Sequence, residues 1–159
     1  MKKLNNPFIH QKGYDCFVCS PTNPIGLHLD FYLDGDVVKT NWQPADVYQG
    51  YPNILHGGIQ ATLLDEIASW AVYVIAGTGG VTSRMEVRYK KPVLINKGKI
   101  YLTGEIIEQK QKIITVCSRL YNNAGDLCTE GFVFYYVFPP EVAKAKMDYP
   151  GQEAFLQKS

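Results

Sequence analysis

The sequence has almost no net charge and no long hydrophobic run. Its 16 Lys and Arg residues nearly balance its 15 Asp and Glu residues, which leaves a formal net charge of +1. Non-specific nucleic-acid affinity grows with the number of phosphates that cationic side chains neutralise, so this balance argues against nucleic-acid binding as the main task. The longest strongly apolar run, residues 67–76, is well short of the ~20 residues that cross a bilayer.

The first residues also lack the apolar segment of a secretory signal. Met1-Lys2-Lys3-Leu4 begins like one, but Asn5, Asn6 and Pro7 follow where the apolar part should be. We therefore expect a cytoplasmic protein with no membrane partner, in a compartment where thiols stay reduced.

Cysteine is scarce, with four residues, and no disulfide is expected. Cys117 and Cys128 lie on either side of a turn at 122–125. If paired residue numbers across this hairpin sum to about 248, Cys117 faces Gly131 and Cys128 faces Leu120, so these two thiols cannot bond.

The other two cysteines form a single C-x-x-C pair, Cys16 and Cys19. One pair without a second at metal spacing is a weak metal signal, so we expect a loop with small buried thiols, no metal and no cofactor. A zinc module that also uses His10 and His28 is the alternative, and a redox pair is a further one.

A chain of 159 residues predicts one domain, and 46 % apolar and 13 % aromatic content favours a globular protein with wide β surfaces. We expect an irregular N-terminal arm at 1–24, a domain at 25–138 and a loose polar tail at 139–159. Alternation and turns predict strands at 27–33, 37–42, 81–91, 98–108, 112–122 and 126–138.

One helix is predicted at 58–76, between the second and third strands. Its apolar residues step by three or four, and Gly77 follows as a stop signal. The fold class is therefore α+β, with one long helix against an antiparallel sheet of about six strands. Because the last strand is apolar on both faces and one helix covers one face, we also predict a homo-oligomer.

The helix start at His56-Gly57-Gly58 is the first candidate site. No Ser, Thr, Asp or Asn stands there to cap it, so unpaired backbone N–H groups are expected to face an oxyanion or a phosphate. A tight turn that requires glycine is the alternative interpretation.

Asp65 lies mid-helix on a narrow face of small residues, where a carboxylate is either a surface group or a positioned acid or base. We expect the adjacent Glu66, about 100° around the helix, to face solvent. In the strand 81–91, alternation puts Thr82 on one face with Arg84, Arg88 and Lys90. The cluster that ends in Arg88, Lys90 and Lys91 suits a solvated edge or a nucleotide phosphate.

Three segments carry a resemblance to a known family. Residues 53–66, Asn-Ile-Leu-His-Gly-Gly-Ile-Gln-Ala-Thr-Leu-Leu-Asp-Glu, resemble the signature of hot-dog fold acyl-CoA thioesterases of the PaaI-like group, and residues 81–92 resemble its next block. Residues 16–27 resemble the N-terminal arm of an uncharacterised branch. The resemblance covers roughly residues 14–138.

The resemblance implies a helix wrapped by the sheet, a dimer or dimer of dimers, and an active site between two subunits. It implies hydrolysis of a small or medium acyl, or aryl, thioester of CoA. The Gly57 N–H would hold the thioester oxygen, and Asp65 of the neighbouring subunit would be general base or nucleophile. His56 would shape the oxyanion loop and Thr82 would place water. Gly58, Glu66, Arg88, Lys90 and Lys91 would bind substrate.

The sequence departs from the family at one position. Many members carry Asn or Gln six residues before the histidine, where this chain has Gly50, and Gln49 would take that role instead. A non-catalytic acyl-CoA or acyl-ligand binding protein is therefore the alternative function. A hot-dog dehydratase or hydratase is a further alternative. Such enzymes use a catalytic His with a carboxylate, and the only His near the helix in this sequence is His56.

Overall fold

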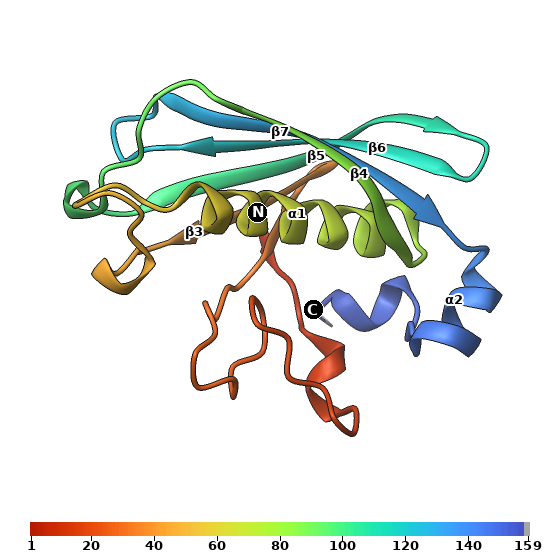
Figure 1. Cartoon of the computed structure of the whole chain (residues 1–159). Coiled ribbons are helices and arrows are strands. Elements are labelled where there is room, and N and C mark those ends of the chain that lie inside the picture. Colours follow the sequence, from red (N-terminus) through yellow and green to blue (C-terminus); the bar gives the residue numbers. More distant parts are fainter. Residues whose placement is uncertain (158–159) are drawn as a thin grey trace.

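A computed structural model describes residues 1–157 of the chain. One helix, α1 (Gly57–Ala71), packs under an antiparallel sheet whose strands run in the order β1-β2-β3-β5-β6-β7-β4 (Figure 1). The strands are β1 (Lys2–Lys3), β2 (Tyr32–Asp34), β3 (Val37–Trp42), β4 (Gly80–Tyr89), β5 (Ile100–Lys110), β6 (Ile113–Tyr121) and β7 (Leu127–Val137). The architecture of one long helix and an antiparallel sheet is confirmed, and the sheet has seven strands because the N-terminal arm adds β1.

The helix buries the apolar stripe that its sequence predicts. Leu63, Ile67, Trp70 and Val74 are all at most 2 % exposed. The backbones approach so closely that a side chain at Gly104 of β5 would lie 3.0 Å from the Ile67 carbonyl oxygen. After α1 the chain makes a π-helical turn, η3 (Val72–Ala76), and Gly77 ends it in the left-handed conformation with φ 69°. The predicted stop is confirmed.

Together α1 and η3, Gly57–Ala76, form 20 residues that are long and apolar enough to cross a membrane by length and composition. Half of the most apolar window is buried inside the domain. A core helix passes the same test, so this feature is weak evidence for a membrane span.

The strand expected to begin at residue 27 begins later. Leu27 and Leu29 donate backbone hydrogen bonds to Phe17 and Val18 of the N-terminal arm, at 2.8 and 2.9 Å. His28 between them has φ 55°, which breaks the extended conformation. Leu27, Leu29 and Phe31 are buried, as the alternation indicates, but the segment pairs with the arm, and β2 starts only at Tyr32.

The arm and the tail cover the helix face that is turned away from the sheet (Figure 1). The arm includes a short 3-10 helix, η1 (Pro7–His10), and the tail includes α2 (Pro140–Met147) and η5 (Gln152–Phe155). Phe155 is fully buried and its ring packs edge-on against Trp70 and Phe8. The expectation of a loose tail is wrong for 139–157, because an aromatic anchor fixes it.

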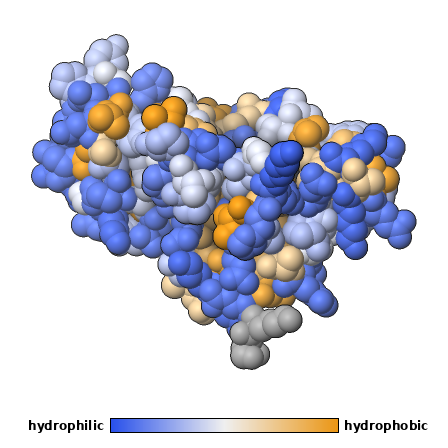
Figure 2. Space-filling model, turned by 90° about the horizontal axis from the view of Figure 1, so that it is seen from below, coloured by the Kyte–Doolittle hydropathy of each residue, from blue (hydrophilic) through white to orange (hydrophobic). Residues whose placement is uncertain are grey.

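Seen from below, this covered side is largely hydrophilic, with small hydrophobic islands (Figure 2). The helix α1 is thus covered on two faces, on one by the sheet and on the other by the N-terminal arm and the C-terminal tail. Two further 3-10 turns, η2 (Asp46–Tyr48) and η4 (Ile95–Lys97), lie in the loops before α1 and β5.

The β6–β7 hairpin has a different register from the one expected. Its turn at 122–125 is confirmed, but the register shifts between Leu120 and Tyr121, so Cys117 pairs with Phe132 and Leu120 with Thr129. All four cysteines are free in this structure.

Candidate active site

The start of α1 is capped by a side chain, contrary to expectation. The His56 Nδ1 accepts a hydrogen bond of 2.8 Å from the Gly58 N–H, and the His56 carbonyl accepts one of 3.0 Å from the Gln60 N–H. Within residues 1–157, the Gly57 N–H has no acceptor. Imidazole replaces the usual short cap, and this leaves the Gly57 N–H open at the positive end of the helix.

Gly57 is tightly enclosed on its other side by β4. The Tyr89 hydroxyl donates a hydrogen bond of 2.7 Å to the Gly57 carbonyl, and an added Cβ at this position would lie 3.3 Å from the Tyr89 ring. At Gly58 an added Cβ would lie 3.0 Å from the His56 Nδ1. The two glycines therefore fit the close contacts of the loop that exposes the N–H.

Asp65 lies on the helix face that meets strands β4 and β7. Its Oδ1 accepts hydrogen bonds from the Thr82 hydroxyl at 2.7 Å and from the Tyr135 hydroxyl at 3.3 Å. Among the described residues no donor reaches Oδ2. Two donors thus fix the carboxylate and leave one oxygen available.

Tyr135 is a site residue that the sequence reasoning missed. Its hydroxyl also donates to the Asp65 carbonyl at 3.1 Å. Burial raises the pKa of Tyr135 well above its usual range, so the phenol stays a donor. A buried tyrosine needs a partner for its hydroxyl, and this was the signal available in the strand pattern. The identity of that partner depends on the packing of β7 on α1.

A β-bulge at Ser83 places the β4 side chains on different faces from those expected. Thr82 pairs with Tyr135 and Arg84 with Phe134, so the register shifts between them. Paired residues share a face, and Tyr135 faces the helix, so Thr82 does too. Arg84 lies on the opposite face, with its guanidinium 4.1 Å from the Phe134 ring centroid. The prediction that Thr82 and Arg84 share a face is wrong because strict alternation ignores the bulge.

Glu66 does not face solvent, so the prediction of a solvent-facing Glu66 is wrong. It is partly buried, and its Oε1 accepts a hydrogen bond of 3.2 Å from the Trp70 indole and lies 3.7 Å from the Cys16 sulfur. Burial, reinforced by the charge of Cys16, raises the pKa of Glu66 to about 7. The side chain therefore lies among arm residues, away from the Asp65 contacts.

Gln49 shares a hollow with the helix start. This hollow, of about 390 Å³, is lined by Gln49, His56, Gly58 and Ile59 among others. The Gln49 side-chain oxygen accepts a hydrogen bond of 3.2 Å from the Asn53 N–H, which leaves the amide nitrogen of Gln49 as a donor. Gln49 therefore lies beside the helix start, in the same hollow as Gly58.

The basic residues separate into two groups. Lys90 and Lys91 line a second hollow of about 300 Å³ together with Gly57 and Tyr89. Their ammonium groups also lie 3.8 Å from Glu130 and 3.6 Å from Asp126. Arg88 alternates with Tyr89 on β4 and therefore lies on the opposite face. Of the three predicted basic residues, Lys90 and Lys91 thus lie near the helix start and Arg88 does not.

Gly57 and Asp65 cannot act together within one chain. They are eight residues apart on a helix that rises ~1.5 Å per residue, so ~12 Å separates them along the axis. A thioester carbonyl must lie ~3 Å from an oxyanion donor and close to its base. The arrangement therefore requires a second copy if both groups are to serve one substrate.

Comparisons with known proteins agree with this architecture. Residues 52–129 match the family model described as the thioesterase superfamily. The chain is 25 % identical, with a TM-score of 0.70, to the crystal structure of a thioesterase superfamily protein, and the match covers 75 % of this chain and 58 % of that one. It thus spans less than two thirds of that protein.

Two other similarities are more distant. A protein of Streptococcus mutans, solved with bound acetyl-CoA, is 19 % identical with a TM-score of 0.64, and the match covers 70 % of this chain and 90 % of that one. This likeness shows the fold alone. An uncharacterized mitochondrial membrane protein of Saccharomyces cerevisiae is 30 % identical over 66 residues, which are 40 % of this chain and 27 % of the yeast protein.

The family match includes the helix start, Asp65 and the whole of β4, and the solved relatives share the arrangement of helix and sheet. Residues 52–129 thus match the thioesterase superfamily, and the chain has the hot-dog fold.

Proposed function

We propose that this chain is an acyl-CoA thioesterase that hydrolyses small or medium acyl, or aryl, thioesters at a site formed by two subunits. The observation that carries the proposal is the carboxylate of Asp65. Thr82 and Tyr135 hold its Oδ1 on the side of an exposed edge strand, while Oδ2 has no donor within the described chain. A carboxylate that is oriented but not neutralised is suited to general-base work.

The chemistry needs an oxyanion donor and an activated water. Asp65 takes a proton from water as the water oxygen bonds to the thioester carbon, and the carbonyl oxygen becomes an oxyanion. The Gly57 N–H of the other subunit stabilises that oxyanion. When the intermediate collapses, the C–S bond breaks, and CoA thiolate and the carboxylic acid are released. A thiolate leaves without a strong acid, so none is assigned.

Asp65 can instead act as the nucleophile: its free oxygen attacks the thioester carbon, the C–S bond breaks and CoA thiolate leaves, which forms a mixed anhydride. Water then hydrolyses this anhydride to the carboxylic acid and the Asp65 carboxyl group. The same two residues are used in both routes. Gln49 and His56 shape the oxyanion loop in either case, and Gly58 lines it. Glu66 keeps no substrate role in this proposal, because its carboxyl lies against Cys16 and Trp70.

A second subunit fits the free edge of the sheet. Strand β4 ends the strand order and leaves Val81 and Tyr89 about half exposed. An antiparallel partner at this edge would pair its open backbone groups and set the helices antiparallel. It would then bring Gly57 of one subunit toward Asp65 of the other, as a dimer or a dimer of dimers.

Lys90 and Lys91 are suited to bind the CoA phosphates, because they lie around the same hollow as Gly57. A fold neighbour solved with acetyl-CoA supports this class of ligand. Membership of the PaaI-like group and a cytoplasmic location remain predictions of the sequence. Non-catalytic acyl-CoA binding is the second candidate, favoured by the missing side chain at Gly50.

Thiol release from a panel of acyl-CoAs tests the proposal. The panel runs from short aliphatic through aryl to long-chain thioesters, with wild type, Asp65→Asn and Asp36→Asn side by side. Asp36 is an exposed turn residue and serves as the matched control. Release by wild type and the control, but not by Asp65→Asn, supports the thioesterase. Binding of acyl-CoA without release by any variant would favour the non-catalytic function.

A further inference from the structure

We propose that Cys16, Cys19 and Glu66 bind one zinc ion that ties the N-terminal arm to helix α1. This site is separate from the proposed thioesterase chemistry and does not depend on it. The sequence offered only a C-x-x-C pair, and the zinc alternative considered there drew on His10 and His28. The fold supplies a different third ligand, 50 residues along the chain from Cys16.

The spacing of the donor atoms suits a tetrahedral ion. The two sulfur atoms and a Glu66 carboxylate oxygen all lie within 4.8 Å of one another, and the Cys16 sulfur is 3.7 Å from the Glu66 Oε1. Zinc binds sulfur at ~2.3 Å and carboxylate oxygen at ~2.0–2.2 Å, so ligands on a tetrahedron are about 3.5–3.8 Å apart. Small side-chain rotations bring all three within range.

The potential negative charges of Cys16, Cys19 and Glu66 also favour a bound cation. Each of the three groups is negative when ionised, and within residues 1–157 no Lys or Arg nitrogen lies within 4.0 Å of the Glu66 carboxylate. Cys19 is buried, and Cys16 and Glu66 are partly buried. Three such groups brought together out of water are destabilising unless they are protonated or neutralised. A divalent cation neutralises two of the charges at once.

Hydrogen bonds outside the ligand set would hold these donors in place. The Trp70 indole N–H donates to the Glu66 Oε1 at 3.2 Å, and the Val18 N–H donates to the Cys16 sulfur at 3.4 Å. The Asn6 amide donates to the Cys19 carbonyl at 3.0 Å. Such contacts orient metal ligands and raise affinity for the ion.

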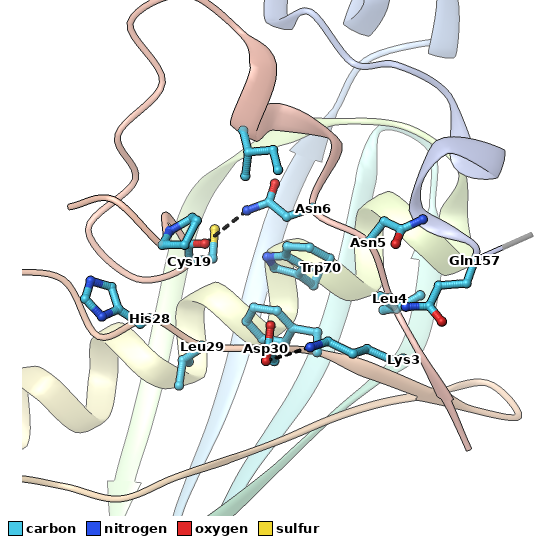
Figure 3. A pocket seen from close by; sticks show the side chains of 13 residues that line it. Lys3, Leu4, Asn5, Asn6, Cys19, His28, Leu29, Asp30, Trp70 and Gln157 are labelled. Atoms are coloured by element: carbon cyan, nitrogen blue, oxygen red, sulfur yellow. Dashed lines mark hydrogen bonds and ion pairs between the residues drawn. The ribbon is translucent and has the colours of Figure 1, made fainter.

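Tyr14 and an open hollow lie beside Cys19. The Tyr14 hydroxyl lies 2.9 Å from the Cys19 sulfur. Cys19 and Trp70 line a hollow of about 330 Å³ that also contains Asn6 and His28 (Figure 3). This hollow would give an ion a route from solvent to Cys19, and a water molecule would be the fourth ligand.

Metal binding by reduced protein tests the inference. Wild type, a Cys16→Ser/Cys19→Ser variant and a Cys117→Ser/Cys128→Ser variant are each titrated with Co²⁺, and then Zn²⁺ is added. The second variant removes the same number of thiols from the sheet. We expect one Co²⁺ per chain, with thiolate charge-transfer absorption, in wild type and the sheet variant. Zn²⁺ should displace it, and the Cys16→Ser/Cys19→Ser variant should show no such absorption.

Glu66→Gln adds a test of the third ligand that keeps both thiols. It should lower Zn²⁺ affinity by at least about tenfold, since partners outside the ligand set already contribute that much, measured by competition with a chromophoric chelator. If the serine variant fails to fold, the wild-type and Glu66→Gln titrations decide. Absence of the absorption in wild type would overturn the inference. So would equal affinity in wild type and Glu66→Gln, or a stable Cys16–Cys19 disulfide that binds no metal.

Discussion

The hydroxyl of Thr82 donates a hydrogen bond of 2.7 Å to the Oδ1 of Asp65, and this contact joins the free edge of the sheet to the middle of the helix. Because Thr82 lies on an edge strand and is exposed, a docking subunit would cover both residues. The pair thus connects the proposed catalytic carboxylate with the proposed subunit interface.

Replacing Thr82 with Val removes the hydroxyl and keeps the shape of the side chain. A hydrogen bond to a charged group contributes ~1.5–3 kcal/mol, and exposure puts this one at the low end. We expect kcat to fall about tenfold and the melting temperature to fall by only a few degrees, measured by thiol release and thermal unfolding. Thr82→Ser keeps the donor and should retain activity. Equal loss in both variants would rule out the donor role.

Gly57 allows the contribution of one N–H to be measured. It is the first residue of α1, where proline is favoured, and His56 before it has φ −56° and ψ 133°, which proline tolerates. Gly57→Pro deletes the N–H, whereas Gly57→Ala keeps it. Both add a Cβ 3.3 Å from the Tyr89 ring.

We therefore expect kcat of Gly57→Pro to be about 100-fold to 1000-fold below that of Gly57→Ala, the effect of one oxyanion donor. The comparison cancels the steric cost of the added Cβ, which both variants share, although proline also carries Cγ and Cδ. Similar rates for the two folded variants would show that this N–H does not hold the oxyanion.

Much of the fold follows from the sequence because its signals are local. The helical stripe and the left-handed Gly77 depend on neighbours a few residues away, and so does the turn at 122–125. The hydrogen bonds of Asp65 could not be derived in this way. They depend on the bulge at Ser83 and on the packing of Tyr135, which strict alternation does not reveal.

The burial of Glu66 and of Phe155 likewise could not be predicted from local sequence signals. A glutamate beside a polar helix face is typical of a surface residue, and its burial results from an arm that folds back over α1. A polar tail with only two aromatics, Tyr149 and Phe155, is typical of a loose segment, but here both rings enter an aromatic cluster.

Phe155→Ala tests whether the tail belongs to the core. The side chain is fully buried, and removing it leaves a cavity among Phe8, Trp70 and Tyr73. We expect the free energy of unfolding to drop by about 3–5 kcal/mol in urea denaturation. Phe138→Ala, at a half-buried position, should cost less. A loss below about 1 kcal/mol for Phe155→Ala would mean that the tail does not stabilise the domain.

We expect Tyr149 to contribute to the loss of folding stability at alkaline pH. Burial raises the pKa of Tyr149 from 10.0 to about 12, and its hydroxyl donates to the Tyr73 carbonyl at 2.8 Å. The unfolded chain loses this proton first, so the stabilisation is complete below pH 10 and is lost as the pH rises toward 12.

Tyr149→Phe should consequently weaken the pH dependence of unfolding between pH 10 and 12. The measurement is urea denaturation at a series of pH values, with Tyr51→Phe, a change at an exposed tyrosine, as the control. An unchanged slope in Tyr149→Phe would show that other groups cause the alkaline unfolding.

The most direct test of the account is to mix two inactive variants, Asp65→Asn and Gly57→Pro, under conditions in which subunits exchange. If each site takes its oxyanion donor from one subunit and its carboxylate from the other, a mixed dimer has one intact site. Random exchange at equal concentrations makes about half the dimers mixed, so about a quarter of the wild-type thiol-release rate should return. A mixture no more active than its separate components would contradict a site shared between subunits.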